Sequence, residues 1–232
     1  MTIRNRAISD EQKQVRRQAI LQAARNLFCV GNFNDVNMAR VAKEARIAKG
    51  TVYLYFKTKE ELFLALLVEM FEAWFEEMDR FLRKKKSSRK ACTIAELLEL
   101  IGHCYEKHPE LMRLNAILHT VLERNIDYSA ARSFKHMLLT RVCQTGIHLE
   151  SSLSFLRPGE GAQILLRSHA LAIGFQHMAE PSPVMKQVIE CEKMQAFEMN
   201  FKEQFLATLK DMLYGIRHRS ESEQERDNPD SE

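Results

Sequence analysis

A short stretch near the N-terminus concentrates side chains that suit contact with a nucleic acid. Residues 49–55 read KGTVYLY, which places an ammonium group, three hydroxyl groups and one position without a Cβ close together. Lys49 can donate to the acceptors of a guanine, Thr51 can bond a base edge or contact a thymine methyl group, and Gly50 permits close approach. The stretch therefore predicts a surface that reads base edges.

Donors for a phosphate backbone follow directly. Tyr53 and Tyr55 carry hydroxyl groups, and Lys57 and Lys59 carry ammonium groups. Such groups bond phosphate oxygens and fix the position of a protein on a duplex. The alternative is that the tyrosines belong to the core and that the lysines are ordinary solvated side chains. The combination of residue types, spacing and local charge favours nucleic-acid contact.

The elements that position these side chains are two short helices separated by a tight turn. Asn37 can cap the first helix, a turn follows around residues 46–48, and the second helix begins near Lys49 and ends near Phe56. Residues 37–56 therefore have the layout of a helix-turn-helix. In such a unit the second helix enters the major groove with its N-terminal residues at the base edges.

The same residues resemble the DNA-binding domain of the TetR family of bacterial transcription regulators. The resemblance is carried by Gly31-x-Phe33, by Val41-Ala42 and by the run KGTVY-x-YFK-x-K-x-x-LF at residues 49–63. It is strong over residues 12–65 and extends to the remainder only in helical layout and length. The DNA contacts that the resemblance and the neighbouring donors imply are Asn37, Ala39, Arg40, Lys49, Gly50, Thr51, Tyr53, Tyr55, Lys57 and Lys59.

Three positions depart from the family pattern. Asn37 stands where the family usually has Thr, Arg46 where it usually has Gly, and Ala48 where Ser or Thr often caps the second helix. Asn37 can still cap, whereas Ala48 gives up a cap worth about 1 kcal/mol. Arg46 places a charged side chain where a residue tolerant of the left-handed backbone is preferred. These departures bear on the DNA contacts more than on the fold.

Positive charge is concentrated at the N-terminal end. Residues 1–60 hold 12 Lys and Arg against 5 Asp and Glu, residues 61–217 hold 20 of each, and residues 218–232 hold 2 against 6. A head that binds a polyanion would show this asymmetry.

Apolar residues recur every three or four positions along nearly the whole chain, and no alternating pattern indicates a strand. We therefore predict an all-α protein with an N-terminal three-helix helix-turn-helix DNA-binding domain at residues 10–57. A larger helical ligand-binding and dimerisation domain is expected at residues 58–217. The acidic tail at residues 218–232 has no large apolar residue and is expected to be disordered.

Some helix ends are marked by their chemistry. Thr58-x-x-Glu61 and Thr93-x-x-Glu96 are capping boxes, in which each side chain can bond the other residue's backbone N–H. Gly31 is expected to end the first helix in the left-handed conformation.

The last helices predict a homodimer. Residues 162–178 are apolar on more than one face, and a further apolar row runs from Phe201 to Ile216, so burial on one side would leave some of this surface exposed. A two-fold symmetric reader of DNA also needs two copies, because one short helix contacts few base pairs. The resemblance implies that the final two long helices of each subunit form the interface. The alternative is that they only complete the core of one subunit.

The resemblance also implies a cavity for a small effector among the central helices. We expect an apolar or amphipathic molecule whose binding shifts the chain between DNA-competent and DNA-incompetent states. The 11 Met and 13 Phe residues would suit an adaptable pocket, although such residues on helical stripes more often form the core. The candidate lining residues are Trp74, Met78, His103, Phe134, Met137, Arg141 and Phe175.

Other classes of protein are disfavoured. The sequence has no P-loop, no nucleophile elbow and no pair of His or Cys residues at metal-ligand spacing, so we predict no catalysis, no cofactor and no metal. Its five cysteines form no C-x-x-C pair, and it has neither a signal-like start nor an apolar run long enough to cross a membrane, which favours the bacterial cytoplasm, and the nucleoid when DNA is bound.

The sequence therefore predicts a DNA-binding transcription regulator that binds a palindromic operator as a dimer and responds to a ligand, with repression as the family default. The alternative is a helical protein that binds a small molecule or a partner without reading specific DNA.

Overall fold

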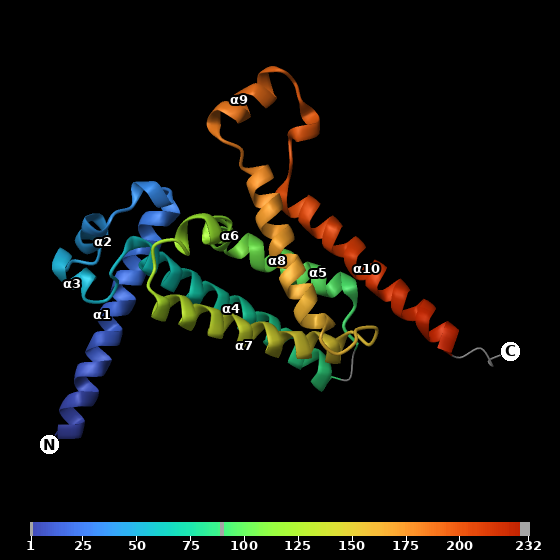
Figure 1. Ribbon diagram of the computed structural model, residues 1–232, viewed down its shortest axis with the longest axis horizontal. Coiled ribbons are helices and arrows are strands. Elements are labelled where there is room, and N and C mark those ends of the chain that lie inside the picture. Colours follow the sequence, from blue (N-terminus) through green and yellow to red (C-terminus); the bar gives the residue numbers. More distant parts are fainter. Residues whose placement is uncertain (1, 89–90, 228–232) are drawn as a thin grey trace. The chain divides into compact units, whose positions relative to one another are not determined.

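The computed structural model describes residues 2–88 and 91–227. Every regular element in these ranges is helical, which confirms the all-α prediction (Figure 1). In chain order the elements are α1 (Thr2–Val30), η1 (Phe33–Asp35), α2 (Met38–Glu44), α3 (Lys49–Tyr53), α4 (Lys59–Ser87), α5 (Ile94–Lys107), α6 (Pro109–Ala116), η2 (Leu118–Leu122), α7 (Tyr128–Ser152), α8 (Glu160–Ala179), α9 (Pro183–Cys191), η3 (Gln195–Phe197) and α10 (Phe201–Asp227).

The chain forms two compact units that are not two consecutive halves. The first unit combines the chain up to Met70 with residues 117–134. The second combines residues 71–116 with the chain from Lys135 onward. The stretch with η2 and the start of α7 therefore belongs with the helix-turn-helix segment, whereas the sequence placed the domain boundary at residues 57 and 58.

Aromatic rings from three elements build the core of the first unit. Phe63 of α4 meets Phe28 of α1 and Phe33 of η1 edge to face, with ring centroids 5.5 Å and 5.1 Å apart. Val41 and Val52 are fully buried and anchor α2 and α3. Full burial of a side chain of this size stabilises a fold by about 1.5–3 kcal/mol. The two short helices are therefore held by their inner faces, and their outer faces stay free.

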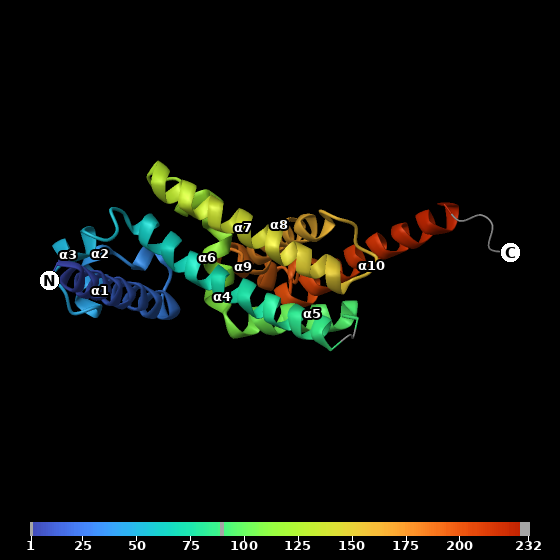
Figure 2. The same cartoon turned by 90° about the horizontal axis from the view of Figure 1, so that it is seen from below.

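In the second unit, α10 lies beside α5 and α8, and α6 packs on α8 (Figures 1 and 2). The helices α7 and α8 cross where their backbones nearly touch. A Cβ at Gly146 would lie 2.6 Å from the backbone nitrogen of Ala162, so this crossing requires glycine.

A polar network joins α4 to α7 inside the second unit. The hydroxyl of Thr145 donates to Oδ1 of the fully buried Asp79 at 2.6 Å. Arg141 donates through Nε to Glu72 at 2.5 Å and lies 3.7 Å from Asp79 Oδ2. The positive charge of Arg141 thus compensates carboxylates on the facing helix, as burial of a carboxylate requires.

Two expectations about helix ends are wrong. Residues 218–227 continue α10 as helix instead of forming a disordered tail, and residues 228–232 lie outside the described residues. Ion pairs support this solvated end of the helix: Arg217 pairs with Glu221 at 2.7 Å, and Arg219 pairs with Glu160. Gly31 is not left-handed, because Gly159 is the only glycine with positive φ in the described ranges.

Two α-helices, α9 and α10, with the short η3 between them, occupy the chain after α8. We call residues 183–197 the arm; it contains α9 and η3 and projects beyond the ends of α8 and α10 (Figure 1). None of its residues is buried. Helix α9 ends at a left-handed residue, Lys193 with φ of 53°, after which Met194 N donates to Ile189 O at 2.9 Å.

Candidate nucleic-acid interface and ligand cavity

Helix α2 begins at a side-chain cap and ends in a left-handed turn. Asn37 Oδ1 accepts hydrogen bonds from the backbone N–H groups of Ala39 (3.1 Å) and Arg40 (3.0 Å), which confirms the predicted cap. Arg46 has φ of 56°, the conformation for which the family pattern uses glycine. Ile47 N then donates to a carbonyl of α2 at 3.0 Å and closes the turn.

Helix α3 keeps its N-terminal turn open to solvent. Val52 is buried, whereas Lys49 and Gly50 are exposed and Thr51 is half-buried. A Cβ placed at Gly50 would meet nothing within 4 Å. Ala48 contributes no side-chain cap, as predicted, and the backbone N–H of Thr51 donates to the carbonyl of Ala48 at 2.9 Å.

The end of α3 presents one aromatic ring and one apolar side chain. Tyr53 is 45% exposed, and Lys49 Nζ lies 5.9 Å from its ring centroid. Tyr55 is half-buried. Leu54 was missed by the sequence reasoning, yet it is 84% exposed. Its apolar type between two tyrosines is the signal that could have found it, because an apolar group beside donors can contact a thymine methyl or a sugar.

Three of the expected cationic contacts already have partners within the first unit. Lys59 Nζ donates to the carbonyl of Phe33 at 2.9 Å and lies 3.8 Å from the centroid of that ring. Lys57 Nζ forms an ion pair with Asp127 at 2.5 Å, although both groups stay accessible. Arg40 Nη1 donates to the carbonyl of Asp35 at 2.5 Å. The lysine charges are thus held by the protein rather than displayed freely.

The start of α4 is held by the loop that follows η2. Thr58 Oγ1 accepts from Glu61 N at 3.0 Å and donates to the carbonyl of Asn125 at 2.8 Å. Glu61 bonds the backbone N–H of Lys57 at 2.8 Å instead of that of Thr58, so the capping box is modified. Asp127 N donates to the other oxygen of Glu61 at 3.4 Å. The carboxylate of Glu61 offsets the positive partial charge at the N-terminal end of α4. We therefore do not expect this helix end to attract phosphate.

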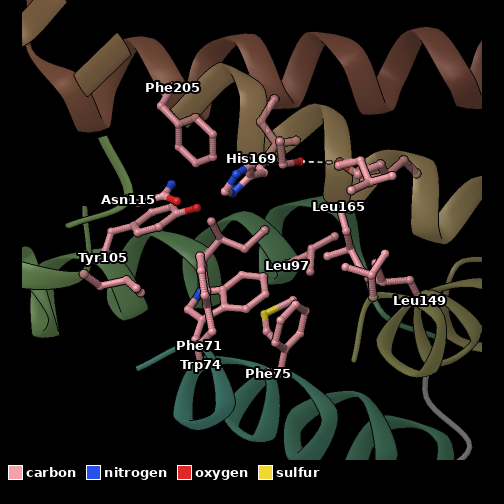
Figure 3. Close-up of a pocket in the computed structure, with 18 of the residues that line it drawn as sticks. Phe71, Trp74, Phe75, Leu97, Tyr105, Asn115, Leu149, Leu165, His169 and Phe205 are labelled. Atoms are coloured by element: carbon pink, nitrogen blue, oxygen red, sulfur yellow. Dashed lines mark hydrogen bonds between the residues drawn. The ribbon is translucent and has the colours of Figure 1, made fainter. Parts of the chain in front are cut away.

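A cavity of about 70 Å³ lies in the core of the second unit (Figure 3). Two predicted residues, Trp74 and Met78, line it. The residues that the sequence did not single out are mainly large apolar side chains from α4 to α10: Phe71, Phe75, Leu97, Ile101, Tyr105, Leu111, Met112, Asn115, Leu138, Val142, Leu149, Ile164, Leu165, Leu166, Ser168, His169, Phe205, Leu209 and Leu213.

The other five predicted lining residues lie elsewhere. His103 borders a surface groove with Lys202 on the outer side of α5. Phe134 is buried in the first unit. Arg141 is committed to the acidic side chains of α4. Met137 and Phe175 are half-buried and do not border the cavity.

The cavity wall is apolar except for a few groups. Ser168 donates to the carbonyl of Ile164 at 2.7 Å, so its hydroxyl is satisfied. Burial raises the pKa of Tyr105, which keeps that phenol protonated at neutral pH. Asn115 Oδ1 and Trp74 Nε1 are buried, and neither has a hydrogen-bond partner among the described residues.

Other kinds of site find no support within residues 2–88 and 91–227. That part of the chain holds no cluster of three His, Cys, Asp or Glu side chains placed to bind a metal. None of its helices is both long and apolar enough to cross a membrane. Burial raises the pKa of the Cys104 thiol to about 12, so this thiol stays protonated.

The first unit holds a helix-turn-helix whose second helix exposes a lysine and a tyrosine, and the second unit holds an apolar cavity. These features are typical of a helix-turn-helix regulator. Residues 20–66 match the family described as "Bacterial regulatory proteins, tetR family". Residues 68–220 match the "Tetracyclin repressor-like, C-terminal domain". The second match alone covers more than half of the chain. The chain therefore belongs to the TetR family.

Relatives of known name share only part of their length with this chain. The "Fatty acid metabolism regulator protein" of Bacillus subtilis is 29% identical over 80 residues, 34% of this chain and 41% of that protein. The "HTH-type transcriptional regulator RutR" of Escherichia coli K12 is 27% identical over 111 residues, 48% and 49%. The "HTH-type transcriptional regulator QacR" of Staphylococcus aureus is 31% identical over 86 residues, 37% and 46%.

A solved structure, that of reduced Escherichia coli NemR, superposes with a TM-score of 0.50 at 18% identity. It covers 84% of this chain and 95% of that one. This likeness concerns the fold.

Proposed function

We propose that the protein is a DNA-binding transcription regulator that acts as a homodimer and responds to a small-molecule effector, with repression as its default mode. The observation that carries this proposal is the open N-terminal turn of α3. Lys49, Gly50 and Thr51 form this turn, and the buried Val52 anchors the helix. Membership of a family of transcription regulators supports it. Such a protein works in the cytoplasm, at the nucleoid when it holds DNA.

The proposed contacts divide into readers of bases and holders of the backbone. Lys49, Gly50 and Thr51 face the base edges, because the first turn of the second helix is the part of such a unit that reaches the groove floor. The backbone holders are Asn37, Ala39, Arg40, Tyr53 and Tyr55, with Lys57 and Lys59 beside them. A positive field over residues 1–60 would strengthen all of these contacts.

A homodimer through α8 and α10 supplies the second reading helix. Leu166 and Met178 of α8 and Tyr214 of α10 are exposed although large and mainly apolar. A surface of this kind on two long helices suits burial against its own copy.

The effector is proposed to occupy the cavity of the second unit. Part of its lining comes from α4, the helix whose first turns belong to the helix-turn-helix unit. A ligand that binds one state of the chain more tightly shifts the population toward that state.

The experiment is a selection of duplexes from a randomised pool, followed by titration of the selected duplex at low and at physiological salt. Wild type is expected to prefer the selected duplex over a scrambled one, and its affinity is expected to fall steeply with salt. Lys49→Ala should relax the preference at one base pair, with a cost of about 1–3 kcal/mol. Tyr53→Phe should weaken binding to all duplexes alike.

The matched control is Lys186→Ala, which removes an exposed lysine of the arm. It is expected to bind as wild type does. Equal affinity of wild type for selected and scrambled duplexes, or an unchanged base preference in Lys49→Ala, would contradict the proposal.

A further inference from the structure

Two buried polar atoms of residues that line the cavity have no hydrogen-bond partner among the described residues. Asn115 is 3% exposed and its Oδ1 has no hydrogen-bond partner among the described residues. Trp74 Nε1 is buried and is equally without one. Buried polar groups are nearly always hydrogen-bonded, because an unmade bond is costly. Two such groups on the wall of one cavity point to a partner that enters it.

One of the two atoms needs an acceptor and the other needs a donor. The indole Nε1–H can only donate, and an amide oxygen can only accept. A ligand that satisfies both must therefore accept from Trp74 Nε1–H and donate to Asn115 Oδ1. A hydroxyl group does both with a single oxygen.

Three polar groups lie together at one end of the cavity. Figure 3 shows the polar ends of Asn115, Tyr105 and His169, from α6, α5 and α8, directed toward the same part of the space. Leu97 and Leu149 lie toward the other end. A ligand with one polar head and an apolar body matches this division.

The wall also selects against charge. It contains no Lys, Arg, Asp or Glu side chain in the part of the chain that the structure describes. Tyr105 is neutral at pH 7, and burial raises its pKa further above the ordinary value. An ionised head placed here would lose its water without gaining a counter-ion, apart from any charge on His169.

The free volume of about 70 Å³ limits the ligand to a small molecule unless side chains move. Met78 and Met112 line the cavity, and methionine changes shape at low cost because its chain is unbranched. The cavity can therefore enlarge to fit a longer body when these side chains change conformation.

We propose that the cavity binds a small neutral molecule with an apolar body and one hydroxyl head, which accepts from Trp74 Nε1–H and donates to Asn115 Oδ1. The effector role of this molecule rests on the proposed function. Its binding in the cavity is independent of that function.

Trp74 makes the test direct, because it is the single tryptophan of the chain. Purified full-length protein is titrated with linear 1-alkanols of increasing length while the fluorescence of Trp74 is recorded. A saturable change is expected with the alcohols. The methyl ethers of the same chain length can accept but not donate, and they should bind about tenfold more weakly. Alkyl carboxylates and alkylammonium ions should bind more weakly still.

Asn115→Leu removes the acceptor and keeps the branched shape of the side chain. The variant is expected to lose about tenfold in alcohol affinity and to bind alcohol and ether alike. Retained binding of the ether shows that its cavity is intact. Ser168→Ala is the matched control, because its hydroxyl lines the cavity but is already bonded to Ile164, and it should bind alcohol as wild type does.

The proposal is overturned if no alcohol gives a saturable change, if a carboxylate or ammonium ion binds more tightly than the alcohol, or if Asn115→Leu still prefers alcohol over ether. DNA affinity is measured separately with and without alcohol. Asn115-dependent binding that leaves DNA affinity unchanged supports the cavity proposal and contradicts the effector role. Failure to bind DNA at all contradicts only the proposed function.

Discussion

Two lysines that look equivalent in the sequence have different surroundings in the folded first unit. Lys59 lies against Phe33, and burial lowers the pKa of its ammonium group because the charged form loses water. Its bond to the Phe33 carbonyl ties η1 to α4. Lys57 is exposed, and its pKa is raised by the hydrogen bond to Asp127. Of the two, Lys57 is the one whose ammonium group is accessible to a phosphate, which would replace Asp127 as its partner.

Arg46 carries a backbone cost that a single substitution can remove. Its φ of 56° is unfavourable for a residue with a Cβ, and glycine adopts it freely. We predict that Arg46→Gly stabilises the first unit by about 1 kcal/mol, measured as a shift of the urea unfolding midpoint. Arg46→Ala removes the same charge but keeps the Cβ, so it should give no such gain. Equal gains in both variants would assign the effect to charge instead.

Helix α5 begins at a complete capping box. Thr93 Oγ1 accepts from Glu96 N at 3.2 Å, and Glu96 accepts from Thr93 N at 3.0 Å, which confirms the predicted capping box. Lys85 of α4 bonds the same carboxylate. The hydrogen bonds from Lys85 and from the Thr93 backbone lower the pKa of Glu96 to about 2.

This depressed pKa predicts how stability depends on pH. A carboxyl whose folded pKa lies below its usual 4.5 stabilises the fold above that pH and loses the contribution as pH falls toward 2. As the pH is lowered from 4.5 toward 2, the urea unfolding midpoint of wild type should therefore decrease, and that of Glu96→Gln should decrease less. Glu99→Gln, an exposed change on the same helix, should follow wild type. If the urea midpoint depended on pH in the same way in all three proteins, Glu96 would not be the cause of the loss of stability.

The sequence predicted best where one short segment decides the structure. The caps at Asn37 and Thr93 and the missing cap at Ala48 each depend on residues within one helical turn, and all three are confirmed. The box at Thr58 was only half right, because Glu61 accepts from the backbone N–H of Lys57 instead of that of Thr58. Glu61 also accepts from Asp127, which no local pattern reveals.

The cavity could be predicted far less well. A period of 3.6 residues tells which face of a helix is buried, but not whether that face meets another side chain or a void. Trp74 and Met78 were found from the apolar stripe of α4. His103 and Arg141 were not, since their helices turn them toward solvent and toward acidic partners. Asn115 was missed because a polar side chain in an apolar helix looks like a surface position.

At the scale of the whole molecule, charge and apolar surface point to separate tasks. The net charge of residues 1–60 is positive, while residues 61–217 hold equal numbers of acidic and basic side chains. The family matches follow the same division, with one for residues 20–66 and another for residues 68–220.

We predict a dimer of twice 27.0 kDa by light scattering at micromolar concentration. Leu166→Glu combined with Tyr214→Glu places charge on the exposed apolar surface of α8 and α10 and should give a monomer, because a buried unpaired charge is costly. Leu139→Glu, a similar change at an exposed leucine of α7, should leave the dimer intact. A dimer in which only Leu139→Glu dissociates would move the interface to α7.

The arm has a consequence for how the chain can vary. Because none of residues 183–197 is buried, the chain can be lengthened, shortened or opened there without deleting a core side chain. Helices α8 and α10, which precede and follow the arm, pack on each other. New termini, a reporter or an affinity handle could therefore be grafted between Pro183 and Phe197 while the cavity and the reading helix are left untouched.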